Sequence, residues 1–290
     1  MNVQNKIKYI DAFAGIGGMS LGIDKVFSPE ETECVGFIEN SKHPMAIYNK
    51  HFPNRTNFGD IETLNPRDLP DFDLLVGGSP CQDLSVARSN RKNLDGSKSK
   101  LFFNFLEILL VKKPKYFLLE NVNSMTPKSR DRISNFLGVE PVMIDSALVS
   151  AQNRKRLYWA NWPISQPKDL EVFAPSVVAW SRSTRYKDKT TGRVYSSPGP
   201  NRKKYAEERE RTNGKAHTLT TGRGCGSLSS KNYIDGEILT PASCEHFQTL
   251  PVCWTLGIPL TARYKAVGNA VTVMVIKHIM SELKKHITNQ

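Results

Sequence analysis

The stretch Phe72-Asp73-Leu74-Leu75-Val76-Gly77-Gly78-Ser79-Pro80-Cys81-Gln82 decides the fold of this chain. Its first five residues form a short, mainly apolar run, which is typical of a buried strand. The glycine pair and the proline that follow predict a sharp turn at the end of that strand. Because open α/β folds bind their ligands at the carboxyl ends of the strands, this turn would present the thiol of Cys81 at a binding edge. A single free cysteine is more often an inert core residue than a nucleophile, so the rest of the chain must decide between the two.

The composition is that of a globular protein with a large basic excess. The 290 residues carry a formal net charge of +12 and a hydrophobic content of 39%. An excess of this size is typical of proteins that bind a polyanion, most often nucleic acid, although charge alone leaves a solvated basic face open. Lysine and arginine clearly outnumber aspartate and glutamate between residues 163 and 238, so part of the excess is concentrated there.

Cysteine spacing and hydropathy exclude several classes of protein. The five cysteines form no Cys-x-x-Cys pair, which argues against a zinc site and against a disulfide framework. The longest apolar run, Leu101 to Val111, is too short to cross a bilayer, and the N-terminus lacks the apolar core of a signal peptide. We therefore expect a cytoplasmic protein without metal or membrane anchor, in which Cys81 stays a free thiol.

A second glycine-rich stretch follows the first predicted strand. Residues 6–14 predict a strand and a turn, Gly15-Ile16-Gly17-Gly18 comes next, and a helix is predicted from Met19 to Val26. Such a loop lets a ligand approach the bare backbone at a helix N-terminus. The dinucleotide pattern Gly-x-Gly-x-x-Gly fails because Ser20 occupies its third glycine position. The loop alone leaves a nucleotide, a flavin and S-adenosylmethionine open.

Two carboxylates narrow the choice to an adenosine ligand. Glu39 ends the strand predicted over 34–38, about where doubly wound folds grip a ribose diol. Asp60 ends a third short strand and is suited to accept a hydrogen bond from an adenine amino group. Acidic residues at strand ends are often only helix caps, but both fall at the expected spacing. Because no phosphate-binding lysine accompanies them, the adenosine would lack phosphates.

An acid and two arginines complete a chemically coherent set. Glu120 directly follows the strand predicted over 116–119, and Arg154 and Arg156 alternate before a strand over 157–160, which places them on one face. A thiolate can add to C6 of a pyrimidine while an acid protonates N3 and guanidinium groups stabilise the developing charge. C5 then becomes a carbon nucleophile that can take a methyl group from a sulfonium cofactor.

With these residues in place, the chain resembles the S-adenosylmethionine-dependent DNA (cytosine-5) methyltransferases over nearly its whole length. The motifs occur in the family's order: Phe13-Ala14-Gly15-Ile16-Gly17-Gly18, Pro80-Cys81-Gln82, Glu120-Asn121-Val122, Gln152-x-Arg154-x-Arg156 and Gly268-Asn269-Ala270-Val271. Two positions depart from the pattern. Ala242 stands where an arginine is common, which we expect to loosen the support of the recognition domain, and Thr272 replaces a frequent proline, which we expect to be neutral.

The resemblance implies the fold and the division of the chain. We expect an α/β protein with a Rossmann-like S-adenosylmethionine-dependent methyltransferase sheet and a small, irregular target-recognition domain. The catalytic domain would comprise residues 1–162 and 239–290, and the recognition domain residues 163–238. Local sequence patterns further predict a polar loop over 83–99, a short helical turn over 206–211 and one final helix from Arg263 to about Ile287.

The resemblance also implies a role for each matching residue. Cys81 would attack C6 of a flipped-out cytosine, Glu120 would engage N3 and the exocyclic amine, and Arg156 would contact O2 and steady Glu120, with Arg154 nearby. The implied cofactor-binding residues are Phe13, Ala14, Gly15, Ile16, Gly17, Gly18, Glu39, Asn40, Asp60, Ile61, Pro80, Leu101, Asn269, Ala270 and Val271. The implied DNA-binding residues are Gln82, Ser85, Arg88, Arg91, Lys92, Thr221, Arg223 and Gly224.

The leading hypothesis is therefore a monomeric enzyme that methylates C5 of cytosine in double-stranded DNA. An RNA cytosine-5 methyltransferase on the same scaffold is the first alternative, but that branch typically carries a Cys-Phe-Thr tripeptide that is absent here. Amino-methyltransferases carry Pro-Pro and an aromatic residue where this chain has Pro80-Cys81. A catalytically silent DNA-binding homologue is the remaining alternative, although every expected catalytic residue is present.

Overall fold

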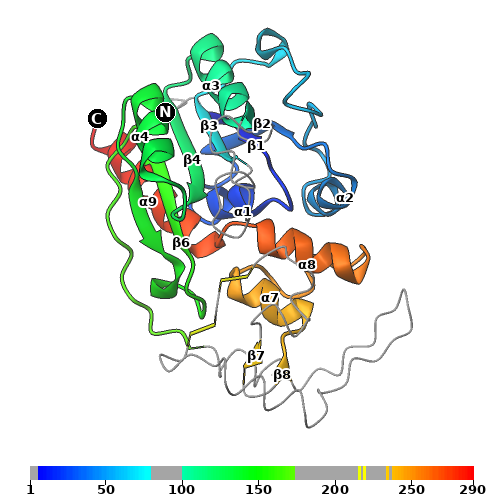
Figure 1. The fold of residues 1–290 in the computed structure, drawn as a ribbon. Coiled ribbons are helices and arrows are strands. Elements are labelled where there is room, and N and C mark those ends of the chain that lie inside the picture. The colour runs from blue at the N-terminus through cyan, green and yellow to red at the C-terminus, as the bar shows by residue number, and fades with distance from the viewer. Residues whose placement is uncertain (1–5, 80–99, 174–214, 217, 220–232, 235–236) are drawn as a thin grey trace.

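The computed structural model describes residues 6–79, 100–173, 215–216, 218–219, 233–234 and 237–290 (Figure 1). Three predicted features lie outside these residues: the turn at Pro80 and Cys81, the polar loop over 83–99 and the short helical turn over 206–211.

A six-stranded sheet forms the centre of the molecule, with strand order β2-β1-β3-β4-β6-β5. Neighbouring strands are parallel from β2 to β4, whereas β6 runs antiparallel to both β4 and β5. The strands are β1 (Ile7–Ala12), β2 (Thr32–Ile38), β3 (Leu74–Gly78), β4 (Tyr116–Val122), β5 (Val142–Asp145) and β6 (Lys155–Ala160). Because β1 lies between β2 and β3, the chain reverses its direction of winding there, and the carboxyl ends of β1 and β3 border the crevice where such sheets bind ligands.

Both faces of the sheet are buried under helices. The helices are α1 (Gly18–Asp24), α2 (Lys42–His51), α3 (Lys100–Lys112), α4 (Pro127–Leu137), α7 (Pro241–Phe247), α8 (Leu260–Asn269) and α9 (Val273–Thr288), with 3₁₀ turns at Pro66–Asp68 and Ser146–Leu148. Successive strand residues point to opposite faces. Tyr9 and Val76 therefore pack in the cluster that includes residues of α1 and α9, while Ile10 and Leu75 pack in the cluster that includes residues of α3 and α4. This arrangement explains the nearly continuous apolar runs of the central strands, and it confirms the predicted α/β class.

A third apolar cluster joins the glycine-rich loop after β1 to residues of the segment 163–238, which was predicted to recognise the target. It contains residues of α7 and α8, Ile16 of the glycine-rich loop, and Ala216 and Leu219. In Figure 1, α7 and α8 lie below the sheet, between it and the short antiparallel pair β7 (Tyr233–Ile234) and β8 (Glu237–Ile238). The helices α7 and α8 thus lie between the sheet and the pair β7 and β8, which belongs to the part of the chain that was predicted to recognise the target.

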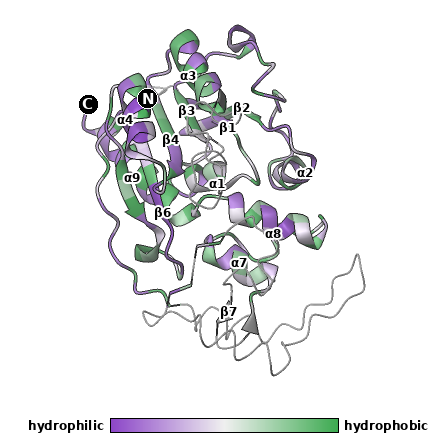
Figure 2. Ribbon diagram, in the orientation of Figure 1, coloured by the Kyte–Doolittle hydropathy of each residue, from purple (hydrophilic) through white to green (hydrophobic). Residues whose placement is uncertain are grey.

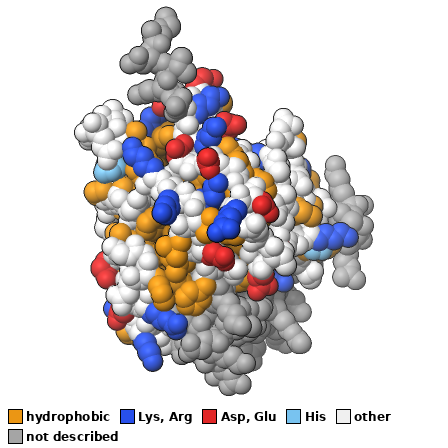
Figure 3. Space-filling model, turned by 90° about the horizontal axis from the view of Figure 1, so that it is seen from above, with side chains coloured by type: hydrophobic (Ala, Val, Ile, Leu, Met, Phe, Trp, Pro, Cys, Tyr) orange, Lys and Arg blue, Asp and Glu red, His pale blue; other side chains and the backbone are white. Residues whose placement is uncertain are grey.

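The hydropathy of the residues along the ribbon agrees with this layered arrangement. Figure 2 shows mainly hydrophobic residues on the central strands and a mixture of both kinds on the surrounding helices. The face seen in Figure 3 carries basic and acidic side chains side by side, with a patch of hydrophobic side chains, so the part of it that the structure describes is not uniformly basic. None of the helices in the described part of the chain has the length and apolarity needed to cross a membrane.

Four local predictions are wrong. The sharp turn was predicted at Gly77 and Gly78, but β3 runs through both, and Glu120 likewise lies inside β4 rather than after it. The third strand before Asp60 is only a single parallel bridge between Phe37 and Asn57. The last helix, predicted as one element from Arg263, is divided into α8 and α9 by residues 270–272.

Thr272 does more than replace a proline. Its side chain is 1% exposed, and its hydroxyl donates to Gln248 Oε1 at 2.9 Å and accepts from Ser146 Oγ at 2.9 Å. These contacts join the break between α8 and α9 to the chain after β5 and after α7. A proline at this position would leave both partners without the hydroxyl.

We expect Thr272→Val to lower the free energy of unfolding by about 1–3 kcal/mol, because it leaves two buried polar groups without this partner. Thr272 makes no side-chain cap to α9, so the change removes only the two hydroxyl contacts. Urea denaturation of this variant beside Thr272→Ser, which keeps the hydroxyl, measures the effect. Equal losses in the two variants would show that the hydroxyl is not responsible.

Candidate active site

A cavity of about 330 Å³ lies at the carboxyl ends of the central strands. Glu120, Arg154 and Arg156 line it together with most of the predicted cofactor residues: Phe13, Ala14, Gly15, Ile16, Gly18, Glu39, Asn40, Asp60, Ile61, Leu101, Asn269, Ala270 and Val271. Gly17 does not line it; it caps α1 in the left-handed conformation and faces Phe52. The structure thus brings the predicted adenosine residues and the predicted acid into one cavity.

The loop after β1 forms one wall of this cavity. Its backbone turns through left-handed conformations at Phe13 and Gly15, both with a φ of 56°. Such a φ is strained for phenylalanine, and strain of this kind is concentrated at functional sites. Gly15 N–H donates to Glu39 Oε2 at 2.9 Å, while Glu39 Oε1 accepts from Ser41 N–H at 2.7 Å. The carboxylate of Glu39 therefore holds the loops after β1 and β2 together.

Asp60 lies at the outer end of the same cavity with its carboxylate already oriented. Its two oxygens accept from the backbone N–H of Glu62 at 3.0 Å and from Asn40 Nδ2 at 2.9 Å. These two hydrogen bonds, the one from Glu62 first, lower the pKa of Asp60 below its usual value. The group is therefore ionised near neutral pH and can accept from an amino group.

Asp11 joins β1 to the first turn of α1, directly after the glycine-rich loop. None of the sequence motifs includes it. It is fully buried in β1, and its Oδ2 accepts from the backbone N–H of Ser20 at 3.2 Å and from Ser20 Oγ at 2.7 Å. Ser20 Oγ also lies 2.8 Å from the hydroxyl of Tyr48 on α2. Burial raises the pKa of Asp11 to about 7. The available signal was an aspartate inside an otherwise apolar strand.

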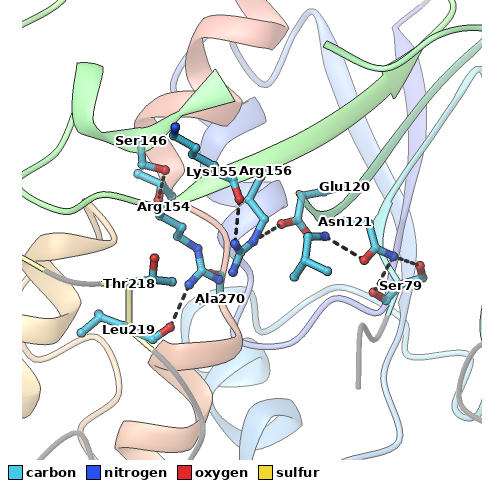
Figure 4. A network of polar contacts seen from close by, with 12 residues as sticks. Ser79, Glu120, Asn121, Ser146, Arg154, Lys155, Arg156, Thr218, Leu219 and Ala270 are labelled. Carbon is cyan, nitrogen blue, oxygen red and sulfur yellow. Dashed lines mark hydrogen bonds and ion pairs between the residues drawn. The ribbon is translucent and has the colours of Figure 1, made fainter. Parts of the chain in front are cut away.

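The acid and one arginine form an ion pair at the centre of the site (Figure 4). Glu120 Oε1 lies 2.9 Å from Arg156 Nε, and the two side chains are 12% and 14% exposed. Strand pairing sets this contact, because β4 and β6 are antiparallel with Val122 opposite Arg156. On the other side of β4, Gly78 lies opposite Glu120, and a Cβ at Gly78 would come within 2.9 Å of Glu120 Oε2. Only glycine at 78 leaves the acid its present position.

Asn121 positions the chain that leads to Cys81. Its Nδ2 donates to Ser79 Oγ at 2.9 Å, and its Oδ1 accepts from the backbone N–H of Val122 at 2.7 Å (Figure 4). Ser79 is the last described residue before Pro80. The residue after the acid therefore holds the start of the cysteine segment against β4.

Arg154 lines the same cavity but binds different partners. Its Nη1 donates to the carbonyl oxygen of Leu219 at 3.0 Å, and its Nη2 donates to those of Gly268 at 3.2 Å and Ala270 at 2.9 Å. The guanidinium of Arg154 is thus placed between the backbone carbonyl of Leu219 and those at the end of α8, whereas Arg156 meets the carboxylate of Glu120.

Several predicted residues lie outside the described part of the chain and stay predictions. They are Cys81 and Pro80 of the nucleophile motif, and Gln82, Ser85, Arg88, Arg91, Lys92, Thr221, Arg223 and Gly224. Conversely, the cavity is lined by residues that motif reasoning missed, including Ser79 and the exposed Lys265. Lys265 is four residues before Asn269 on α8, so helical spacing from the last motif was the signal that could have found it.

The cavity fits S-adenosylmethionine. Its volume falls in the range of small-molecule sites, about 300–1,000 Å³. The described lining residues include the carboxylates of Glu39, Asp60, Glu62 and Glu120, which complement a cationic sulfonium ligand. Within the described residues no group of side chains could hold a metal ion.

Comparison with known proteins places the chain in a family. The sequence model described as C-5 cytosine-specific DNA methylase matches residues 7–160 and 172–285. The Type II methyltransferase M1.ScrFI of Lactococcus lactis subsp. cremoris is 31% identical, over 96% of this chain and 78% of its own length. The Type II methyltransferase M.NlaX of Neisseria lactamica is 30% identical, over 96% of each chain. The protein therefore belongs to the C-5 cytosine-specific DNA methylases, enzymes that transfer a methyl group from S-adenosylmethionine to cytosine in DNA.

Solved structures agree on the fold. The Entamoeba histolytica methyltransferase EhMeth superposes with a TM-score of 0.72 at 15% identity, covering 98% of this chain and 99% of that one. A DNMT2 variant of Spodoptera frugiperda gives a TM-score of 0.69 at 17% identity, covering 96% and 100%.

We expect Gly78→Ala to lower the rate of methyl transfer by roughly 10- to 100-fold, because its Cβ would push the carboxylate of Glu120 off its position. Tritium transfer from labelled cofactor to duplex DNA measures the rate. Gly77→Ala is the control, since a Cβ there would meet Ala12 O at 2.8 Å and not Glu120; it should cost mainly stability. A Gly78→Ala enzyme with the wild-type rate would contradict the steric argument.

We also expect Asp11→Asn to remove a pH dependence of stability. Because the pKa of Asp11 is raised on folding from its usual value of about 4 to about 7, the folded state binds more protons than the unfolded state between these values. Wild-type stability therefore falls as the pH rises through this window. The stability difference between the Asp11→Asn variant and wild type, followed by urea denaturation from pH 4.5 to 8, should shift in the variant's favour as the pH rises. A constant difference would refute this assignment.

Proposed function

We propose that Cys81 is the nucleophile of this DNA (cytosine-5) methyltransferase and that Glu120 is its acid, held by Arg156. The observation that carries the proposal is the ion pair between Glu120 and Arg156 beside Gly78, three residues before Cys81, in the cavity lined by the cofactor residues. The thiol, the acid and the methyl donor would then meet at one edge of the sheet.

In the proposed reaction, the thiolate of Cys81 adds to C6 of a flipped-out cytosine, forming an S–C6 bond as N3 takes a proton from Glu120. S-adenosylmethionine supplies, when bound, an electrophilic methyl group on its sulfonium. C5 would take that methyl group as its bond to sulfur breaks and S-adenosylhomocysteine leaves. The proton on C5 would then pass to water, the S–C6 bond would break to regenerate the thiolate of Cys81, and N3 would return its proton to Glu120.

Arg156 keeps the acid in place through this cycle. A carboxyl group that is 12% exposed needs a partner when it is ionised, and the Nε contact at 2.9 Å supplies one. The planar guanidinium leaves further N–H groups that can donate to O2 of the base. Removing Arg156 would leave Glu120 both uncompensated and free to rotate.

The cofactor residues divide by position in the cavity. Phe13 and Ile61 would flank the adenine, Glu39 would accept from the ribose hydroxyls, and Asp60 would accept from the adenine amino group. Pro80 and Leu101, the backbone of Ala14 to Gly18, and Asn40, Asn269, Ala270 and Val271 would enclose the rest of the ligand.

Duplex DNA would be bound by two further segments. Gln82, Ser85, Arg88, Arg91 and Lys92 would close over the flipped base. Thr221, Arg223 and Gly224 would contact the target within the recognition domain of residues 163–238, flanked by the two parts of the catalytic domain, 1–162 and 239–290. The basic excess of that segment supports contacts to phosphates. We further infer a monomer that acts on DNA in the cytoplasm of a bacterial or phage-infected cell; the similar methyltransferases include bacterial and phage proteins.

Replacing the nucleophile tests the mechanism. We expect Cys81→Ser to lose methyl transfer by at least about a thousandfold, because a serine hydroxyl is far less ionised than a thiol near neutral pH. The readout is covalent trapping: duplex DNA containing 5-fluorocytosine, incubated with cofactor, should give a band of enzyme–DNA adduct that resists denaturation. Wild type should form it and the serine variant should not. An adduct with the serine variant, or none with wild type, would refute the proposed role of Cys81.

A further inference from the structure

Ala216 and Leu219 lie alongside the segment that precedes β6 and make hydrogen bonds to it. Ala216 forms a parallel bridge with Gln152, its N–H donates to Ala151 O at 2.7 Å, and its carbonyl oxygen accepts from Asn153 N–H at 2.9 Å. Further along, the N–H of Leu219 donates to Gln152 Oε1 at 3.4 Å. The described residues that lead into 220–232 are therefore held by the same motif that carries Arg156.

Lys215 fixes the beginning of the described residues that pair with the segment before β6. Its Nζ donates to Val172 O at 2.6 Å and to Ala147 O at 2.8 Å, and it lies 5.0 Å from the ring centroid of Phe173. Residues 172 and 215 are the two ends of the segment between them, so one ammonium group holds both ends on the 3₁₀ turn after β5. The predicted recognition segment, residues 163–238, is thus anchored beside Gln152. This anchor is present although alanine replaces the arginine that is common at position 242.

Arg154 joins Leu219 to the wall of the cofactor cavity. Arg154 is 3% exposed, and its guanidinium lies between Leu219 and Ala270 (Figure 4). It also donates to the carbonyl oxygen of Gly268. Gly268 and Ala270 flank Asn269, which lines the cavity. Gln248 strengthens the connection, because its Nε2 donates to Ala270 O at 3.0 Å while its Oε1 accepts from Gln152 Nε2 at 2.9 Å. A planar fork of fixed geometry therefore sets the distance between the two segments.

We propose that Arg154 is a positioning residue that couples the DNA-recognition segment to the cofactor cavity. It holds Leu219, which lies beside residues 220–232, and the carbonyl groups around Asn269 in one geometry. The proposal rests on the proposed function, in which residues 163–238 recognise DNA. Seating of that segment on DNA then orders the wall of the cofactor cavity, and a bound cofactor orders the segment by the same free energy.

The test is the binding of S-adenosylhomocysteine to the full chain, with and without duplex DNA, by calorimetry. The duplex carries a site that the wild-type enzyme methylates, identified by bisulfite sequencing. We expect the duplex to tighten binding to wild type by about 5- to 100-fold, the range of typical coupling energies. In Arg154→Lys, which keeps the charge but cannot reach carbonyls on both sides, we expect the ratio of the two dissociation constants to fall to within about twofold of one.

Arg263→Lys is the matched control. Arg263 is 1% exposed and pairs with Glu245 at 2.9 Å, so the variant also loses a buried guanidinium, but this pair makes no contact with Leu219 or Ala270 in the described residues. It should keep the wild-type ratio even where both variants lose thermal stability.

Two outcomes would overturn the coupling: an unchanged ratio in Arg154→Lys, or the same loss of the ratio in Arg263→Lys. A wild-type enzyme that methylates the duplex yet binds S-adenosylhomocysteine equally with and without it would also overturn the coupling, and would leave the proposed function intact. Failure of the proposed function would be seen separately, as a wild-type enzyme that does not methylate duplex DNA.

Discussion

The close approach of β3 to β1 and β4 is the constraint on which the site depends. A Cβ at Gly77 would come within 2.8 Å of Ala12 O, and one at Gly78 within 2.9 Å of Glu120 Oε2. The two glycines therefore let the strand that precedes Cys81 pass between the end of the strand that precedes the cofactor loop and the strand that carries the acid. A larger residue at 77 would strain the packing of β3 against β1, and one at 78 would displace the carboxylate of Glu120 from its place beside Arg156.

Much of the fold follows from sequence because the sheet is buried on both faces. Its central strands read as apolar runs, and runs separated by helical spacing predict a parallel sheet. Since parallel strands end at the same edge, the residues at those ends, such as Phe13, Glu39 and Glu120, could be expected to gather there, and they line one cavity. These residues were placed at strand ends from the sequence alone, so their gathering at one edge could be predicted before the strand order was known.

The errors share a physical cause, namely partners that are distant in sequence. Glycine usually marks a turn, but Gly77 and Gly78 lie inside β3. The neighbouring strands β1 and β4 come so close there that a side chain would not fit without a shift. The helix after Arg263 breaks at residues 270–272, where carbonyl oxygens bind Arg154 and Gln248, contacts that local periodicity does not contain. Asp11 resembles any polar interruption of a strand until Ser20 is seen to donate to it.

The two arginines of Gln152-x-Arg154-x-Arg156 show how partners decide a role that spacing leaves open. Both were predicted on one face, and both line the cavity. Arg156 meets a carboxylate, so its positive charge compensates the charge of Glu120. Arg154 meets neutral carbonyl oxygens, whose bonds fix the separation of two backbone segments. Guanidinium is suited to both tasks because its N–H groups are rigidly directed. A motif in which two identical side chains alternate can therefore hold a buried carboxylate with one arginine and join two backbone segments with the other, and the residues opposite each arginine determine which.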